Sequence, residues 1–373
     1  MDEFHNLLQA LMSHDNSTRG GAEAAYNGVQ ASDPSTLLSC LATTVHECER
    51  LELRAFAAVL LRRASAAVWQ NPAFSADAKE AVKAALLGSL QSETEGHIRN
   101  KVADTVSSVA FAVFNVDDGH EWPELLPFLL QCCQAPEAPF RESALTIVGK
   151  LVEWMQSLAA EEATFKEIFA ANLGADAGPG PRLAALRAVC KFVPALDNSA
   201  SFGDLMAPMV QVAADALTGG DEERGRAAFE ELIELVEVDV KFMRPQIEAI
   251  GQMTLEICQS ESLQESTRHM GLEFLLSLAE QCPGLMRKMD LTKEMLPLAI
   301  QFMLELDDDE SWELHEGQEE DEECETYTIG EEAVYRIGSA IGGNTVLPVM
   351  EGMLGGLLGS EDWRQVSRGL QLQ

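Results

Sequence analysis

The sequence of 373 residues has little positive charge and few aromatic side chains. Lysine and arginine number 26 against 61 aspartates and glutamates, which leaves a formal net charge of −35. Nucleic acid binding depends on cations that neutralise phosphates, so this balance disfavours nucleic acid as a partner and favours basic proteins. A charge of this size also keeps a chain soluble without any binding role, and composition leaves that alternative open.

Long hydrophobic runs and paired cysteine motifs are missing as well. No stretch approaches the ~18 apolar residues of a membrane span, so we predict no membrane insertion. The eight cysteines include no Cys-x-x-Cys pair, and most lie on apolar helical faces, where a free thiol behaves as a small hydrophobe. Such thiols are typical of the reducing cytosol or nucleus.

Catalytic and cofactor motifs are also missing. The glycines of 174–182 lie between predicted helices with no preceding strand, which excludes a dinucleotide fingerprint. His46 is followed by Arg50 where a zinc protease would place its second histidine. In an acidic run that begins at residue 307, Trp312 occupies the position at which a calcium loop requires glycine. We therefore predict no enzyme, no metal site and no cofactor.

Seven arginines, by contrast, recur at nearly constant spacing. The intervals are 35, 45, 42, 41, 42 and 44 residues, and a small residue follows three positions later in six of the seven cases. A period near 40 to 47 residues without strand signals is typical of paired-helix HEAT or armadillo repeats, in which each pair buries its apolar face against its neighbours. We expect the arginines to be partly buried and to form a structural ladder. They are Arg19, Arg54, Arg99, Arg141, Arg182, Arg224 and Arg268.

Apolar periodicity predicts about nine helix pairs, each with an outer helix A and an inner helix B that opens near the arginine. The predicted fold class is all-α, a HEAT-repeat α-solenoid wound as a right-handed superhelix. The predicted pairs are 2–12 with 16–30, 34–47 with 49–68, 75–91 with 95–114, 122–134 with 138–155, 160–173 with 180–195, 201–218 with 221–238, 243–259 with 263–281, 291–306 with a helix from near 329, and a ninth pair that the chain leaves incomplete.

Four regions follow from this reading. Residues 1–114 form the N-terminal repeats, 115–306 continue the array, 307–328 are an acidic loop inserted in the eighth repeat, and 329–373 complete the eighth repeat and begin a ninth. Twelve of the nineteen residues from Asp307 to Glu325 are acidic, and none is lysine or arginine. Such a segment has too little apolar surface to fold alone.

Six segments of the chain resemble the importin-β (karyopherin-β) nuclear transport receptors, most of all the β3 branch. Each segment is a weak motif alone, but their order and spacing over the whole chain are specific. They are SHDNSTRGGAEAAYNGV (13–29), LRAFAAVLLRRA (53–64), EWPELLPFLLQCC (121–133), DDDESW (307–312), IGGNTVLPVM (341–350) and DWRQVSRGL (362–370).

The resemblance implies a monomeric import receptor that shuttles between cytoplasm and nucleus. It implies binding of the GTP form of Ran by an N-terminal arch, of phenylalanine-glycine repeats of nucleoporins in A-helix grooves, and of cargo with basic nuclear localisation signals. The family's main cargo site extends over middle repeats, some of which this chain lacks. We expect the chain to be a fragment of a longer solenoid or a truncated gene product.

The resemblance also implies that the acidic loop contacts Ran or basic cargo, with Trp312 as an apolar anchor. A solvated spacer without a partner is the alternative for the loop. For the whole chain, the alternative is a HEAT scaffold subunit of a phosphatase or chaperone assembly, which gives no reason for the acidic insert. The candidate partner-binding residues are Asp307, Asp308, Asp309, Glu310, Trp312, Glu319, Glu320 and Asp321.

Overall fold

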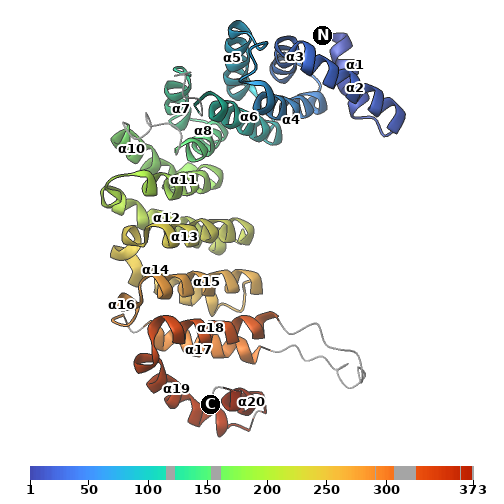
Figure 1. The fold of residues 1–373 in the computed structure, drawn as a ribbon. Coiled ribbons are helices and arrows are strands. Elements are labelled where there is room, and N and C mark those ends of the chain that lie inside the picture. Colours follow the sequence, from blue (N-terminus) through green and yellow to red (C-terminus); the bar gives the residue numbers. More distant parts are fainter. Residues whose placement is uncertain (115–121, 153–160, 290, 306–324, 362, 372–373) are drawn as a thin grey trace. The chain divides into compact units, whose positions relative to one another are not determined.

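The computed structural model describes residues 1–114, 122–152, 161–289, 291–305, 325–361 and 363–371, and every regular element in these ranges is a helix (Figure 1). The helices follow one another in antiparallel pairs, as expected for an all-α HEAT-repeat solenoid. The chain divides into two compact units, Met1–Leu196 (unit 1) and Asp197–Gln373 (unit 2). The division falls inside the region 115–306, which the sequence predicts to be continuous.

Unit 1 has two layers, one formed by the first helix of each pair (A) and one by the second (B). In the B layer, α4 packs on α6, α6 on α8 and α8 on α11, while α3 packs on α5 in the A layer. The A helices are α1 (Asp2–Leu11), α3 (Pro34–Glu47), α5 (Ala76–Ser92), α7 (Leu125–Cys133) and α10 (Glu162–Leu173). The B helices are α2 (Asn16–Ser32), α4 (Leu51–Val68), α6 (Gly96–Phe114), α8 (Ala138–Leu151) and α11 (Pro179–Phe192).

Unit 2 repeats the arrangement, with α13 packed on α15 and α15 on α18 in its B layer. Its A helices are α12 (Met206–Thr218), α14 (Ile247–Cys258), α17 (Thr292–Leu304) and α19 (Gly343–Leu358). Its B helices are α13 (Glu222–Met243), α15 (Glu265–Gln281), α18 (Glu325–Ile341) and α20 (Trp363–Gln371). The short helix α16 (Pro283–Met286) and 3-10 turns at Ser199–Leu205 and Arg244–Gln246 connect them.

Local sequence explains where many helices begin. The side chains of Asp15, Asp33, Ser75 and Asp221 each accept a hydrogen bond from a backbone N–H three residues later, at the start of α2, α3, α5 and α13. Each such cap satisfies a donor that the helix leaves unpaired and is worth ~1 kcal/mol. Pro34 at the first position of α3 adds a residue whose fixed backbone angle suits a helix start.

The small residue three positions after six of the seven arginines lets the two helices of a pair approach closely. Ala57, Ala144 and Ala185 are at most 2% exposed. At Gly271 a Cβ atom would lie 2.8 Å from the Cys258 sulfur on the paired helix, too close for any larger residue without movement. The periodic small position is therefore a packing requirement of the repeat.

The observed helices differ from the predicted ranges at a few ends. The helix expected from near residue 329 begins at Glu325, so the predicted loop 307–328 loses its last residues to α18. The helix expected from 201 begins as a 3-10 turn and becomes α-helical only at Met206. The helix expected to end at 238 continues to Met243 across a break at Asp239, whose backbone leaves the helical region.

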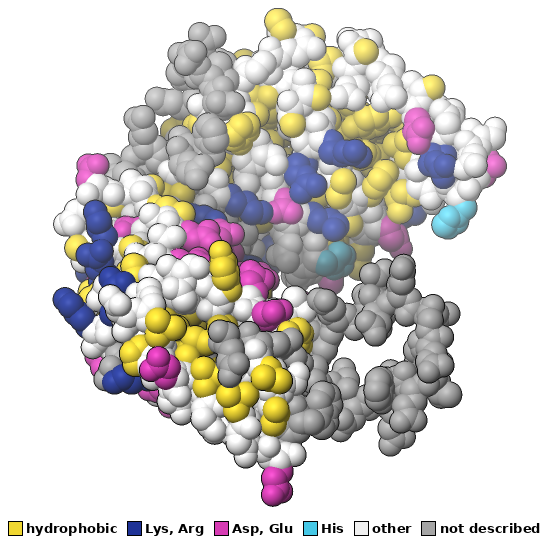
Figure 2. Space-filling model, turned by 60° about the horizontal axis from the view of Figure 1, so that its bottom comes forward, with side chains coloured by type: hydrophobic (Ala, Val, Ile, Leu, Met, Phe, Trp, Pro, Cys, Tyr) yellow, Lys and Arg dark blue, Asp and Glu magenta, His cyan; other side chains and the backbone are white. Residues whose placement is uncertain are grey.

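One end of unit 2 carries an apolar surface. Figure 2 shows hydrophobic side chains gathered over the end formed by α19 and α20. Leu347 of α19 and Leu370 of α20 are 58% and 61% exposed. Among the helices that the structure describes, none is long and apolar enough to cross a membrane.

Candidate partner-binding surface

The recurring arginines bind the ends of the A helices that precede them. Arg19, Arg54 and Arg141 each donate to the backbone carbonyl six residues earlier, at distances of 3.3, 2.9 and 2.8 Å. Arg182 reaches the carbonyl of Leu173, at 3.2 Å, and Arg268 that of Cys258, at 2.8 Å. Carbonyls at the end of a helix lack partners within the helix, so each arginine caps the A helix of its own repeat.

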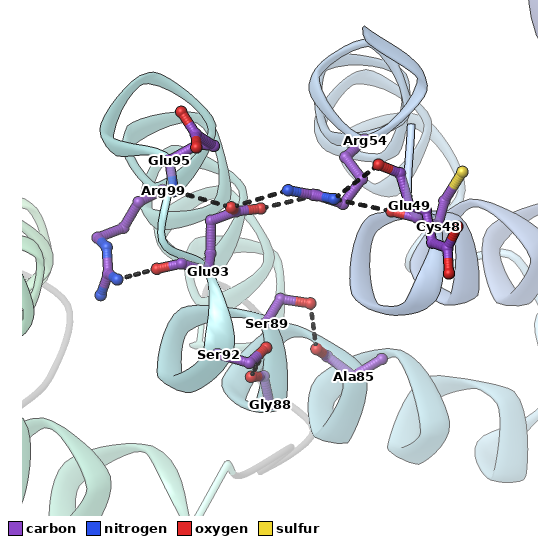
Figure 3. Close-up of polar contacts among 10 residues, drawn as sticks. All are labelled: Cys48, Glu49, Arg54, Ala85, Gly88, Ser89, Ser92, Glu93, Glu95 and Arg99. Carbon is purple, nitrogen blue, oxygen red and sulfur yellow. Dashed lines mark hydrogen bonds and ion pairs between the residues drawn. The ribbon is translucent and has the colours of Figure 1, made fainter. Parts of the chain in front are cut away.

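Three of these arginines also reach the next repeat (Figure 3 shows the first). Arg54 binds both carboxylate oxygens of Glu93, at the end of α5, with distances of 2.9 and 3.0 Å. Arg268 binds both oxygens of Glu305, at the end of α17, at 2.8 and 2.6 Å.

In the same way Arg141 donates to the Asn172 side-chain oxygen of α10, at 3.0 Å. One guanidinium thus joins the ends of two successive A helices, which is the geometry that a structural ladder requires. Arg224 instead pairs with Asp221 in its own helical turn.

Burial affects the pKa of one ladder arginine, Arg99, and of Glu93, the partner of another. Burial raises the pKa of Glu93, but the hydrogen bonds from Arg54 and from the backbone N–H of Glu95 outweigh it and leave the pKa below its usual value. Arg99 is 5% exposed and donates to the carbonyls of Leu90 and Glu93. Its guanidinium lies 4.5 Å from the centre of the Phe140 ring, and burial lowers its pKa. These groups favour a structural role for the ladder because they lie inside the repeat contacts.

Unit 2 contains an acidic cleft between α15 and α18, with a volume of about 700 Å³. Glu265 and Glu273 of α15 and Glu332 of α18 line it together with Arg336. Glu332 is 64% exposed. The lining carries more acids than bases, so the cleft attracts cations.

Arg336 is the one arginine in this lining, which contains no lysine, and acids surround it. It binds both oxygens of Glu273, at 2.7 and 3.0 Å, and both oxygens of Glu280, at 2.7 and 3.2 Å. Glu332 lies 3.9 Å away. The hydrogen bonds that Arg336 donates to Glu280 and Glu273 raise the pKa of its guanidinium, which stays charged. One positive charge among three carboxylates leaves the group with a net negative charge.

Helix α15 holds both flanks of the acidic insert. Before the insert, Glu305 is bound by Arg268 in the first turn of α15. After it, the Thr326 hydroxyl lies 3.1 Å from the ring nitrogen of His269 and donates to Glu265 at 3.3 Å. Thr326 is 2% exposed. The chain therefore leaves and re-enters the described structure at the same end of α15, beside the acidic cleft.

The predicted loop residues lie outside the described residues, so their geometry is not part of the site. They are Asp307, Asp308, Asp309, Glu310, Trp312, Glu319, Glu320 and Asp321. Sequence reasoning missed the cleft that adjoins them. The spacing of eight and seven residues from Glu265 to Glu273 to Glu280 places these acids on one face of a helix, and this signal could have identified it.

A second cavity lies in unit 1 between α5 and α7, with a volume of about 460 Å³. Phe128, Pro136 and Phe140 line it together with Cys132 and Ala135, and its polar lining residues are Gln91, Gln131, Gln134 and Glu137. Such a groove suits an aromatic side chain of a peptide. Among the described residues, no group of three or more histidine, cysteine or acidic side chains is arranged to hold a metal ion.

A stack of helix pairs with charged and apolar clefts on its surface defines a class of α-solenoid proteins that bind other proteins. The chain matches family models described as "IPO5-like, TPR repeats" over residues 94–253 and "Importin repeat" over residues 260–348. It belongs to the importin-β family, in the branch of importin β-3 and importin-5.

The chain is 26% identical to importin subunit beta-3 of Saccharomyces cerevisiae over 96% of its own length and 34% of the relative. A probable importin-5 homolog of Dictyostelium discoideum is 22% identical over 81% of this chain and 29% of the relative. The chain therefore spans about a third of the length of these relatives.

Solved structures of Kap121p have the same fold. The structure of Kap121p superposes with a TM-score of 0.85 at 24% identity. The match includes all of this chain and 36% of the Kap121p chain. Kap121p bound to RanGTP gives 0.83, and Kap121p bound to Nup53p gives 0.84.

Proposed function

We propose that this protein is a nuclear import receptor that binds cargo with basic nuclear localisation signals. The observation that carries the proposal is the acidic cleft of α15 and α18, in a chain of the importin-β family. Glu265, Glu273 and Glu332 line the cleft, and α15 also holds both flanks of an insert with twelve acids. A lysine-rich peptide would place ammonium groups among these carboxylates.

Ran in its GTP form and nucleoporins are the further partners in this proposal. The relatives that bear on it are Kap121p bound to RanGTP and Kap121p bound to Nup53p. The apolar groove between α5 and α7, with Phe128 and Phe140, has the chemistry to accept a phenylalanine side chain of a nucleoporin repeat. The proposed loop residues, Asp307 to Glu310 with Trp312 and Glu319 to Asp321, would contact Ran or cargo.

The protein would act without catalysis, as a monomer that moves between cytoplasm and nucleus. Cargo and Ran-GTP would exclude one another, so that Ran-GTP releases cargo in the nucleus. This is a coupling between two binding equilibria, and by linkage cargo would lower the affinity for Ran-GTP by the same factor.

The test is a binding assay of the immobilised chain with Ran loaded with GTP or with GDP. We expect retention of the GTP form only, and release of a bound lysine-rich peptide when Ran-GTP is added. Equal retention of both forms, or of neither, would contradict the receptor function and leave a HEAT scaffold of another complex as the function. The same assay with a lysine-rich peptide alone separates loss of the cargo site from loss of Ran binding.

A further inference from the structure

The B helices of unit 1 are cationic, although the whole chain has a net charge of −35. Helices α4, α6, α8 and α11 contain ten lysines and arginines and only three acids. The acids are Glu52, Asp104 and Glu142. The bases are Arg54, Arg62, Arg63, Arg99, Lys101, Arg141, Lys150, Arg182, Arg187 and Lys191. Three of the four B helices of unit 2 are the reverse, because α13, α15 and α18 together contain thirteen acids and five bases.

The ladder does not account for this surplus. Four of the ten bases are ladder arginines at the start of each helix, where they cap A helices. The other six lie further along the helices, and five of them are exposed; Lys101 is half-buried. Because α4, α6, α8 and α11 pack side by side, these six bases belong to one layer of unit 1. We call this group the cationic face, defined as Arg62, Arg63, Lys101, Lys150, Arg187 and Lys191.

Two of these six bases share one acid across the layer. Asp104 of α6 pairs with Arg62 of α4, at 3.4 Å, and with Lys150 of α8. The three side chains are 44%, 36% and 47% exposed for Arg62, Asp104 and Lys150. One carboxylate shared between two half-exposed cations cannot neutralise both, so the trio retains a positive charge that solvent and ligands can reach.

We propose that the cationic face binds an extended acidic segment of a partner protein. The charge is complementary to carboxylates, and the exposed bases can form charge-assisted hydrogen bonds with them. Packed helices lie ~8 to 10 Å apart, so four of them span roughly 27 Å. An extended peptide rises ~3.3 Å per residue, so about eight residues cover the face.

An acidic protein segment fits this face better than nucleic acid does. A polyphosphate meets repulsion from the remaining charge of the molecule, and Asp104 stands in the middle of the bases that would contact it. A peptide can place a neutral or donor residue opposite Asp104. This acidic partner has the opposite charge to the basic cargo proposed above. The experiments can therefore contradict one of the two proposals and support the other.

The test measures binding of a fluorescent peptide with about eight glutamates to the full 373-residue chain by fluorescence polarisation. A glutamine peptide of the same length tests whether binding needs the negative charge. An oligodeoxynucleotide of similar length tests whether phosphates bind instead of carboxylates. The double variant Arg62→Glu with Lys150→Glu should raise the Kd for the glutamate peptide about tenfold. Asp104→Asn should lower it about threefold, because it removes a carboxylate that competes for Arg62 and Lys150.

The matched control is the double variant Lys241→Glu with Lys288→Glu, which makes the same change in net charge at two exposed positions of unit 2. It should change the Kd less than about twofold. Equal loss in the control and in the Arg62→Glu, Lys150→Glu variant would overturn the proposal, since net charge alone would then govern binding. Asp104→Asn that lowers the unfolding temperature without strengthening binding would also overturn it, as would tighter binding of the oligonucleotide than of the peptide.

Discussion

The two units share one fold but differ in how they distribute charge. Unit 1, Met1–Leu196, contains 15 lysines and arginines against 24 acids, whereas unit 2, Asp197–Gln373, contains 11 against 37. The difference is sharpest in the B layers, which are cationic in α4 to α11 and anionic in α13 to α18. A repeat that fixes helix packing through apolar and small positions leaves the exposed positions of each helix free to carry either sign.

The comparison teaches that the overall charge is a poor guide to any one surface of a solenoid. The value of −35 favours basic partners for the molecule as a whole. Exposed charges act over only ~8 Å at physiological salt, so a local cluster of bases governs what binds beside it. Each layer of each unit therefore needs its own account of partners.

The first prediction compares the inter-repeat ion pairs of the two units. Arg54→Ala should lower the free energy of unfolding by ~3 kcal/mol, because it leaves the carboxylate of Glu93, 4% exposed, without its partner. Arg268→Ala should cost ~2 kcal/mol, since Glu305 is 29% exposed and can be hydrated. Hydrogen exchange of α5 and α6, or of α15 and α17, measures the two losses separately. Equal losses would show that burial of the acid does not set the cost.

The second prediction concerns the pH dependence of unit 1. The folded-state pKa of Glu93 is lowered, so its stabilising contribution is present above the unfolded pKa of ~4.3 and is lost as pH falls through the folded pKa. In Arg54→Ala, burial is the remaining main influence and raises the pKa of Glu93. In this variant the contribution of Glu93 to the free energy of unfolding should therefore increase as the pH falls. In the parent chain the same contribution decreases as the pH falls.

Hydrogen exchange of α5 and α6 between pH 4 and 7 follows this contribution. Glu93→Gln is the control, because it removes the titrating group and should remove both trends. The same sign of pH dependence at this site in the parent chain and in Arg54→Ala would refute the assignment of the lowered pKa to Arg54.

A third experiment tests the acidic cleft of unit 2. Glu332→Lys should weaken binding of a lysine-rich peptide about fivefold, because a 64% exposed acid of the cleft becomes a competing cation. Glu52→Lys, at an exposed position of α4 in unit 1, makes the same charge change outside the cleft and should have little effect. Titration calorimetry supplies both affinities. An equal loss of affinity in the two variants would show that net charge, and not the cleft, determines binding of the peptide.

The smallest expected effects are kinetic and concern the acidic insert. Neutralising Asp307, Asp308, Asp309 and Glu310 should slow association with Ran-GTP or lysine-rich cargo a few-fold and flatten its salt dependence. Trp312→Ala should instead speed dissociation, as expected of a desolvated aromatic anchor. Stopped-flow rates at two salt concentrations separate the two effects. Unchanged rates with both partners would identify the insert as a spacer.

Much of the helix order could be predicted from the sequence. The period from Arg19 to Arg268 predicts where the B helices begin, and the structure places α2, α4, α6 and α8 within two residues of the predicted starts. Caps and apolar stripes are local signals, so they can be recognised without neighbours. Errors were confined to ends such as Glu325, where the acidic run masks the first turn of a helix that packing on α17 supports.

The partners of the arginines could not be predicted in the same way. Glu93, Asn172 and Glu305 lie 39, 31 and 37 residues from their arginines, so they share no spacing, and Asn172 differs from the other two in residue type. The acids of the cleft lie around one site only because α15 and α18, which the insert separates in the sequence, pack against each other. Such contacts depend on the angle and rotation of each helix in the stack, which nearby residues do not encode.

The sequence by itself determined the class of fold and the pairing of helices, because these depend on periodicity within and between successive repeats. The importin-β family was indicated by the resemblance of six sequence segments. Only the tertiary structure decided which exposed side chains share a surface. It brought Arg62, Asp104 and Lys150 together across three helices, and Glu265, Glu273 and Glu332 around one cleft. The reason is physical: burial selects apolar side chains by their local period, whereas a binding surface is assembled from positions that burial leaves unconstrained.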